Sequence, residues 1–380
     1  MIRRIHISWI AILIIMILLT ACWDQRLLRD HSLILTIGYD KAENNGIVKT
    51  IIFPKNTSGG GGGGGQTELE KESEVISVTG DTVKDTEKHM DQKIPEKFDR
   101  SKARVIFFGE ELATEGIFST LDSVYRDLRG PLNAKIAIFA GKAKDALSFH
   151  PKQALLTSDI YANLLESAEQ AGITKNENVQ IACPIILVEG KDVVFPYVSV
   201  NQEETEAIVE GVALFHDDQM TGTLNIKETS MFLILSDQIS KYTALNLKVQ
   251  DDQEDYNKNF VNIAIRKNTR KINLNVNKDE IRADLQITLE VEIDEYALDH
   301  LSDEDRVKKL SNDIESELKK LSEETLAKMQ EANNDSLGLG EKLKAYHHAT
   351  WEKVDWTKEY PDIPIEADFN VEIIRHGITN

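Results

Sequence analysis

The stretch Leu285-Gln286-Ile287-Thr288-Leu289-Glu290-Val291-Glu292-Ile293 decides the fold of the C-terminal third. Every second residue is apolar, and those between are polar or charged, which predicts a strand with one buried face and one face in water. Val261 to Ile265 and Ile272 to Val276 alternate in the same way, with Lys267-Asn268-Thr269-Arg270 between them, and Phe369 to Ile373 supplies a last strand. The pattern indicates an antiparallel sheet covered on one side only.

A long amphipathic helix is predicted to provide that cover, between residues 302 and 333. Its apolar residues recur every three or four positions and form one stripe, as in a helix that packs on a sheet. Ser302, with Asp305 three residues later, resembles a capping box at its start. The stripe consists of Val307, Leu310, Ile314, Leu318 and Leu321. We therefore expect residues 251–380 to form a C-terminal domain with helices packed on one face of the sheet.

The N-terminal half alternates between strand-like and helix-like segments, which predicts an α/β domain over residues 22–185. Seven consecutive glycines, Gly59 to Gly65, lie in a segment expected to be a flexible loop, residues 56–68. From about Asn178 strand-like patterns dominate, and residues 186–250 are expected to form a small middle domain. The predicted fold class is α+β, with three mixed α/β domains.

The first 22 residues have the layout of a bacterial lipoprotein signal. Arg3 and Arg4 precede an uncharged apolar run from Trp9 to Leu19, and the run ends at Leu19-Thr20-Ala21-Cys22. Cleavage is therefore predicted after residue 21, with a diacylglyceryl group on Cys22. Two acyl chains, at about 0.8 kcal/mol per buried CH₂, hold a protein stably at a membrane. An uncleaved membrane anchor is the alternative.

Composition excludes some classes of partner. The formal charge is −20 over 380 residues, which argues against nucleic-acid binding because such proteins carry basic surfaces. It also argues against electrostatic attraction to anionic lipid, so membrane attachment would rest on the lipid group. Apart from Cys22 the chain has one cysteine, Cys183, in an apolar stretch typical of a small buried side chain rather than a reactive thiol.

No catalytic, cofactor-binding or metal-ligating residue is predicted, and the chain is not expected to be an enzyme. His347-His348 and His376 lack the spacing of known metal motifs. Ser316 to Lys319 matches S-x-x-K, but it lies on the amphipathic helix without the companion motifs of that chemistry. Four aromatic residues could line a ligand pocket, although completion of the core is the simpler interpretation: Tyr346, Trp351, Trp356 and Tyr360.

Taken in order, five groups of residues behind the lipoprotein signal resemble the spore-germination receptor C-subunit lipoproteins, the Ger(x)C family. The groups are Cys22-Trp23-Asp24 with Gly38-x-Asp40-Lys41; Gly109-Glu110-Glu111-Leu112-Ala113-x-x-Gly116; Gly211 with Phe215; Gly222 with Glu228-Thr229; and Asp335-x-x-Gly338-x-Gly340 with Trp351, Trp356 and Gly377. The chain departs from the family pattern in its glycine run, at Lys102, where a histidine is frequent, and at Leu339, where a phenylalanine is usual.

The resemblance implies a lipid-anchored, non-enzymatic subunit of a nutrient-sensing complex on the outer face of the spore inner membrane. It implies partners of two kinds, an A subunit with soluble and membrane parts and a B subunit similar to amino-acid transporters. Because the sequence shows no convergent polar cluster, metal motif or phosphate loop, no small-molecule ligand is predicted for the isolated subunit. Two rival interpretations remain: a solute-binding lipoprotein that delivers a small nutrient to a transporter, with two similar lobes around a cleft, and a cell-wall hydrolase.

Overall fold

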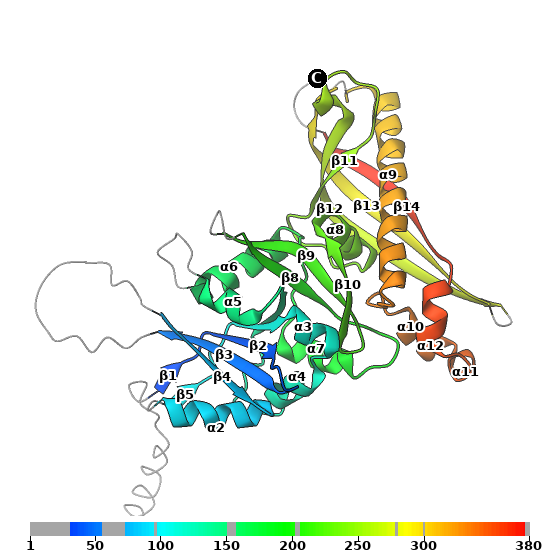
Figure 1. The fold of residues 1–380 in the computed structure, drawn as a ribbon. Coiled ribbons are helices and arrows are strands. Elements are labelled where there is room, and N and C mark those ends of the chain that lie inside the picture. The colour runs from blue at the N-terminus through cyan, green and yellow to red at the C-terminus, as the bar shows by residue number, and fades with distance from the viewer. Residues whose placement is uncertain are drawn as a thin grey trace, which may run out of the picture.

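The computed structural model describes residues 31–54, 73–94, 97–149, 157–201, 206–277, 280–298 and 301–376. The signal peptide expected at 1–21, the lipidation site Cys22 and the glycine loop expected at 56–68 lie outside these residues. The described residues form an eight-stranded sheet, a four-stranded sheet and a short parallel pair, β1 and β5 (His31–Leu33 and Lys97–Asp99). Figure 1 shows the two large sheets one above the other, with helices around both. The α+β fold class is confirmed.

The eight-stranded sheet has the order β10-β9-β8-β7-β6-β2-β3-β4. Four strands in the middle, β2, β6, β7 and β8, are parallel, and antiparallel strands complete both ends. Its strands are β2 (Thr36–Lys41), β3 (Ile47–Pro54), β4 (Ser73–Gly80), β6 (Val105–Gly109), β7 (Lys135–Phe139), β8 (Val194–Asn201), β9 (Glu206–His216) and β10 (Gln219–Asn225).

Helices cover both faces of this sheet, so its central strands are buried on both sides. In β6, Ile106 and Phe108 belong to one core and Val105 and Phe107 to the other. The first core is completed by α2, α3, α4 and α7, and the second by α5 and α6. The helices are α2 (Val83–Lys93), α3 (Glu110–Glu115), α4 (Phe118–Tyr125), α5 (Ala143–Ser148), α6 (Thr157–Gln170) and α7 (Val179–Ile186).

The segment expected to form a middle domain, residues 186–250, has no sheet of its own within the described part of the chain. Strands β8, β9 and β10 extend the N-terminal sheet, because Ile138 and Phe139 of β7 pair with Tyr197 and Val198 of β8. The next strand, β11 (Ala244–Lys248), joins the C-terminal sheet instead. The division into three domains stays a prediction.

Residues 179–186 form a helix, α7, where strand-like patterns were expected. The Asn178 side chain accepts a hydrogen bond from the Ile181 backbone N–H (3.0 Å) and caps the start of the helix. The helix then buries Val179, Ala182 and Cys183 against the sheet. Burial raises the pKa of the Cys183 thiol to about 12, in agreement with the expectation of an unreactive buried cysteine.

The four-stranded C-terminal sheet has the order β11-β12-β13-β14. The first three strands are antiparallel, as expected, but β14 (Ile365–Arg375) lies parallel to β13 (Glu280–Tyr296). This orientation follows from the intervening helix α9 (Glu304–Glu331), which returns the chain along the sheet before β14 begins. The apolar residues from Leu285 to Ile293 are all buried, as the alternation predicts.

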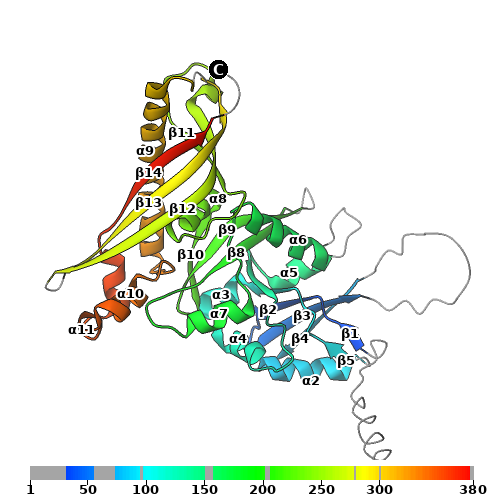
Figure 2. The ribbon, with the colours of Figure 1, turned by 180° about the vertical axis from the view of Figure 1, so that it is seen from behind.

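Helix α9 covers one face of this sheet, as expected. Leu310, Ile314, Leu318 and Leu321 of its stripe are buried, and Val307 is half-buried. The side chain that caps the helix is that of Asp303, which accepts from the Asp305 N–H, rather than that of Ser302. Figure 2 shows the molecule from behind, with the strands of the C-terminal sheet in front of α9. The part of the chain that the structure describes contains no helix of the length and apolarity needed to span a bilayer.

A polar stretch inside the C-terminal sheet was expected to separate two strands, but β12 is continuous (Phe260–Asn277). Asn268 and Arg270 face the covered side, opposite Leu289 and Ile287 of β13. The Asn268 Nδ2 donates to the Ile234 carbonyl (2.8 Å), and the Arg270 Nη1 donates to the Leu235 carbonyl (2.8 Å). The Leu235 carbonyl ends helix α8 (Ile226–Leu235) without a partner in the helix, and the Ile234 carbonyl also accepts from the backbone N–H of Asp237 (3.1 Å). The polar residues therefore bind α8 to the sheet.

Candidate functional site: a buried junction, a motif cluster and a charged cleft

The motif residues of the N-terminal half meet at the carboxyl ends of β2, β6 and β7. Asp40, at the end of β2, accepts hydrogen bonds from the backbone N–H groups of Ala143 (2.7 Å) and Lys144 (2.9 Å). Gly109, at the end of β6, lies against it: a Cβ there would come within 2.1 Å of the Asp40 Oδ1. Burial raises the pKa of Asp40, while the two N–H donors act in the opposite direction. A side chain at position 109 would displace the Asp40 carboxylate.

The acidic residues that follow Gly109 are bound to the protein itself. The Glu110 carboxylate accepts from the Tyr197 hydroxyl (3.1 Å) and from the Gly141 N–H (3.2 Å), and the Glu110 N–H donates to the Gly141 carbonyl (2.9 Å). The Lys41 ammonium pairs with Glu115 and lies 3.5 Å from Glu111. A hollow of about 370 Å³ opens here. These bonds fix the loops after three parallel strands.

The C-terminal motif residues form a second cluster, between the two sheets, around Asp335. This side chain is only 1% exposed. Its carboxylate accepts from the backbone N–H groups of Leu339 (2.9 Å) and Gly340 (2.7 Å) and from the Trp356 indole N–H (3.0 Å). Burial raises the pKa of Asp335 to about 7, although the three donors and their dipoles favour the ionised form.

Asp335 is connected to the N-terminal sheet through Asp192, in the turn before β8. The Asp192 carboxylate accepts from the backbone N–H groups of Asp335 (2.7 Å) and Asp217 (2.9 Å), and its own N–H donates to the Asp335 carbonyl (3.2 Å). Gly190 lies so close to Gly340 that a Cβ at position 340 would be 2.7 Å from the Gly190 Cα. The backbones of the two halves are therefore in direct contact.

Asn334 completes this junction. Its side-chain amide donates to the carbonyls of Val193 (3.1 Å) and Phe215 (2.5 Å), at the ends of β8 and β9. Its own carbonyl accepts from the hydroxyl of buried Tyr360 (2.8 Å). Trp356 lies between Trp351 and Tyr360, with ring centroids 6.1 and 5.7 Å away. Of the four aromatic residues considered as a pocket, these three pack in a row whose middle member, Trp356, is hydrogen-bonded to Asp335, and Tyr346 is exposed.

Helix α8 lies beside the junction and is buried on all sides from Glu228 to Leu235. Asn225 and Glu228 form a capping box at its start, and Lys328 of α9 pairs with Glu228 (2.6 Å). Its apolar residues share one core with Val212 and Leu214 of the N-terminal sheet and with the covered face of the C-terminal sheet. The motif around Glu228-Thr229 thus marks the helix that joins the two halves.

Three residues at the rim of the junction could in principle contact a metal ion: Asp192, His216 and Asp217, whose candidate ligand atoms lie within 4.8 Å of one another. Both Asp192 oxygens already accept backbone N–H groups, however, and Asp217 is exposed. The nearby Asp192 carboxylate raises the pKa of His216. We assign this group to the junction rather than to a metal.

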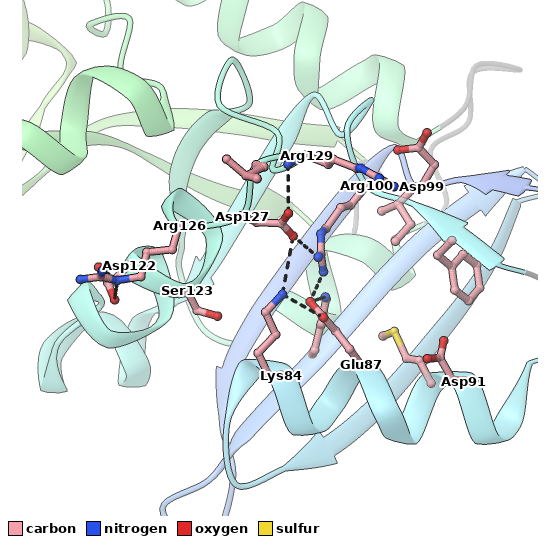
Figure 3. Close-up of a pocket in the computed structure, with 15 residues that line it drawn as sticks. Lys84, Glu87, Asp91, Asp99, Arg100, Asp122, Ser123, Arg126, Asp127 and Arg129 are labelled. Atoms are coloured by element: carbon pink, nitrogen blue, oxygen red, sulfur yellow. Dashed lines mark hydrogen bonds and ion pairs between the residues drawn. The ribbon is translucent and has the colours of Figure 1, made fainter. Parts of the chain in front are cut away.

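A charged cleft of about 850 Å³ lies on the N-terminal unit, away from both motif clusters. Figure 3 shows Lys84 and Glu87 of α2 lying against Arg100 and Asp127, from the segments after β5 and α4. Lys49 of β3 lines the same cleft; its side chain is 2% exposed, and its ammonium lies 3.6 Å from Glu87. Sequence analysis missed these residues, because four separate segments supply them and no spacing motif connects them.

Comparison with known proteins places the chain among spore germination proteins. A family model described as the spore germination protein N-terminal domain matches residues 24–200, and the "Spore germination B3/ GerAC like, C-terminal" model matches residues 210–377. The spore germination protein GerQC of Bacillus cereus is 22% identical over 372 residues, which cover 98% of this chain and 99% of that protein. The spore germination protein KC of Bacillus subtilis (strain 168) is 22% identical, over 100% of this chain and 98% of its own.

A solved structure supports the fold. The crystal structure of the GerBC protein superposes with a TM-score of 0.57 at 15% sequence identity, over 89% of this chain and 96% of the other. The two family models together span both sheets and the junction between them. The chain therefore belongs to the GerAC-type spore germination protein family, the family of germinant receptor C subunits.

Proposed function

We propose that this protein is the lipid-anchored C subunit of a nutrient germinant receptor. It is held by a diacylglyceryl group on Cys22 at the outer face of the spore inner membrane. There it contributes to germination through assembly or signal transmission, together with the A and B membrane subunits. Family membership supports the role in germination. The lipoprotein pattern that ends at Cys22 supports the anchor.

The observation that carries a scaffold or relay role is the junction between the sheets. Buried Asp335 and Asn334 bind the ends of β8 and β9, and one apolar core runs from the N-terminal sheet through α8 to the C-terminal sheet. A densely packed core transmits displacement with little compression. A force applied to one sheet would therefore move the other. A non-enzymatic role agrees with the motif carboxylates being engaged by the protein's own donors.

The solute-binding alternative is less well supported. Such proteins enclose their ligand between two similar lobes. Here one unit has an eight-stranded sheet with helices on both faces and the other a four-stranded sheet, and a buried polar and apolar junction fills the space between them. We also propose the division into folding units 22–185, 186–250 and 251–380, with the middle unit contributing strands to both sheets.

The test is affinity capture of the full chain from detergent-solubilised spores, followed by identification of the proteins that co-purify. We expect the A and B subunits with the wild-type chain. Cys22→Ala should lose the diacylglyceryl group and leave the membrane fraction. A mutant as firmly membrane-bound as the wild type would contradict the lipid anchor. Capture of a transporter without any A subunit would contradict the receptor assignment and favour the solute-binding alternative.

A further inference from the structure

The floor of the charged cleft carries an imbalance of charge. Three cations, Lys49, Lys84 and Arg100, share two carboxylates. Glu87 pairs with all three, and Asp127 pairs with Lys84 (3.6 Å) and Arg100. Within the described residues, Glu87 is the one carboxylate within 4 Å of the Lys49 ammonium. Over the whole lining of the cleft five cations face five carboxylates, which include Asp91, Asp99 and Asp122, so the one cation in excess is confined to this floor.

The excess charge is costly because the Lys49 side chain is only 2% exposed. Removing an ammonium from water is costly unless an anion compensates. Glu87 compensates Lys49 only in part, since Arg100 and Lys84 compete for it. Burial lowers the pKa of Lys49 to about 8, with Arg100 and Lys84 acting in the same direction and Glu87 against them. A further anion at the floor would relieve this cost.

The shape of the cleft limits the anion. Arg100 already donates to Glu87 and Asp127, and the Arg126 Nε donates to both oxygens of Asp122. A further carboxylate at the floor would therefore pair mainly with the ammonium groups of Lys49 and Lys84. The space of about 850 Å³ is far larger than one carboxylate, and its wall includes Phe98 and Met90. At the rim, the Leu128 side chain is 102% exposed. The ligand should therefore carry apolar groups on both sides of its carboxylate.

We propose that this cleft binds an acidic segment of a partner polypeptide, with a glutamate or aspartate carboxylate at the Lys49–Lys84–Arg100 floor and flanking apolar side chains against Phe98, Met90 and Leu128. A free small carboxylate would gain only the ionic part of this interaction and would bind weakly. The charge arrangement supports this site independently of the receptor assignment.

The experiment titrates the purified chain, residues 23–380, with two blocked peptides at low ionic strength by calorimetry. The first is acetyl-Ala-Leu-Glu-Leu-Ala-amide, and the second has Gln in place of Glu. We expect the Glu peptide to bind about tenfold or more tightly than the Gln peptide, as loss of a charge-assisted hydrogen bond implies. At pH 8, in two buffers that differ in ionisation enthalpy, we expect uptake of up to about half a proton, because the ligand favours protonated Lys49. Sodium acetate should bind far more weakly.

Three variants locate the site. Lys84→Met, at a half-exposed position that can change without loss of fold, and Lys49→Met should each weaken binding of the Glu peptide about tenfold. Lys88→Met, on the same helix but outside the cleft, removes the same charge and should bind as the wild type does. The proposal would be overturned if the two peptides bound with equal affinity, or if neither bound at millimolar concentration. It would also be overturned if Lys88→Met and Lys84→Met lost the same affinity, or if acetate bound as tightly as the Glu peptide.

Discussion

At the scale of the residue, Asp335 shows how a family motif can be structural. The sequence contains the motif but gives no sign of its partners, because Asp192 and Trp356 are distant in the chain. The motif spacing itself has a local cause: the N–H groups of residues 339 and 340 point back at the Asp335 carboxylate. No periodicity or composition could have predicted that this carboxylate is buried between two sheets.

Asp335→Asn is expected to destabilise the fold by about 1–3 kcal/mol at pH 5, because the amide NH₂ group would face N–H donors. This cost should shrink as pH rises to 8. The pKa of Asp335 is about 7 in the folded protein and near 3.8 in the unfolded chain. Between these pH values the unfolded chain binds fewer protons than the folded protein. The wild type therefore loses stability as the pH rises through this range. Urea unfolding at several pH values measures the difference.

The control is Asp362→Asn, an exposed position that should match the wild type at every pH. Because His216 titrates in both proteins, subtracting the two stability curves removes its contribution. If the stability lost in Asp335→Asn, relative to the wild type, grew with pH, the folded state would favour the ionised carboxylate. That result would contradict the raised pKa of Asp335.

At the scale of the element, the sequence predicted what depends on periodicity and missed what depends on distant partners. The alternation from Leu285 to Ile293 and the α9 stripe were sufficient for the sheet and its cover. The continuity of β12 through Asn268 and Arg270 was not predictable, since their partners are carbonyls at the end of α8. The parallel pairing of β14 was also missed, because alternation carries no information about strand direction.

Arg270→Met is expected to destabilise the protein by about 1–3 kcal/mol, because the buried Leu235 carbonyl would lose its donor. Lys271→Met is the matched control: Lys271 follows directly, faces the opposite side of the sheet and is exposed. Thermal unfolding by circular dichroism compares them. Identical melting temperatures for the two variants would mean that the α8 carbonyl finds water or another donor.

Leu318→Asp is expected to cost several kcal/mol, on the order of a buried unpaired carboxylate, because Leu318 is fully buried on the stripe of α9. Ser316→Asp introduces the same side chain two residues earlier, at an exposed position, and should change stability by less than about 0.5 kcal/mol. Chemical denaturation measures both. A similar loss in the two variants would show that the stripe is not the face that packs on the sheet.

At the scale of the whole molecule, the α+β class and the position of the C-terminal unit followed from the sequence, but the extent of the N-terminal sheet did not. Its eight strands come from residues 36–225 and include three that were expected to fold apart. Strand patterns reveal which residues are buried but not which neighbour buries them. The charged cleft escaped prediction for the same reason.

Residues 23–380 are expected to show flat melting curves when titrated with amino acids, sugars and nucleosides, if the chain acts as a scaffold or relay. A ligand at about 100 times its dissociation constant would stabilise the fold by about 2.7 kcal/mol. That corresponds to a shift on the order of 5–10 °C, which differential scanning fluorimetry resolves easily. A saturable upward shift with one nutrient would favour the solute-binding alternative.

The shared core also restricts how relatives of this protein can exchange parts. A hybrid joined between β10 and α8 would place one parent's Val212, Leu214 and Leu224 against the other parent's α8, α9 and C-terminal sheet. Such a hybrid could fold only if both parents had matching side chains on the two sides of α8. Recombination within the family should therefore favour exchange of both sheets together, rather than of one sheet alone.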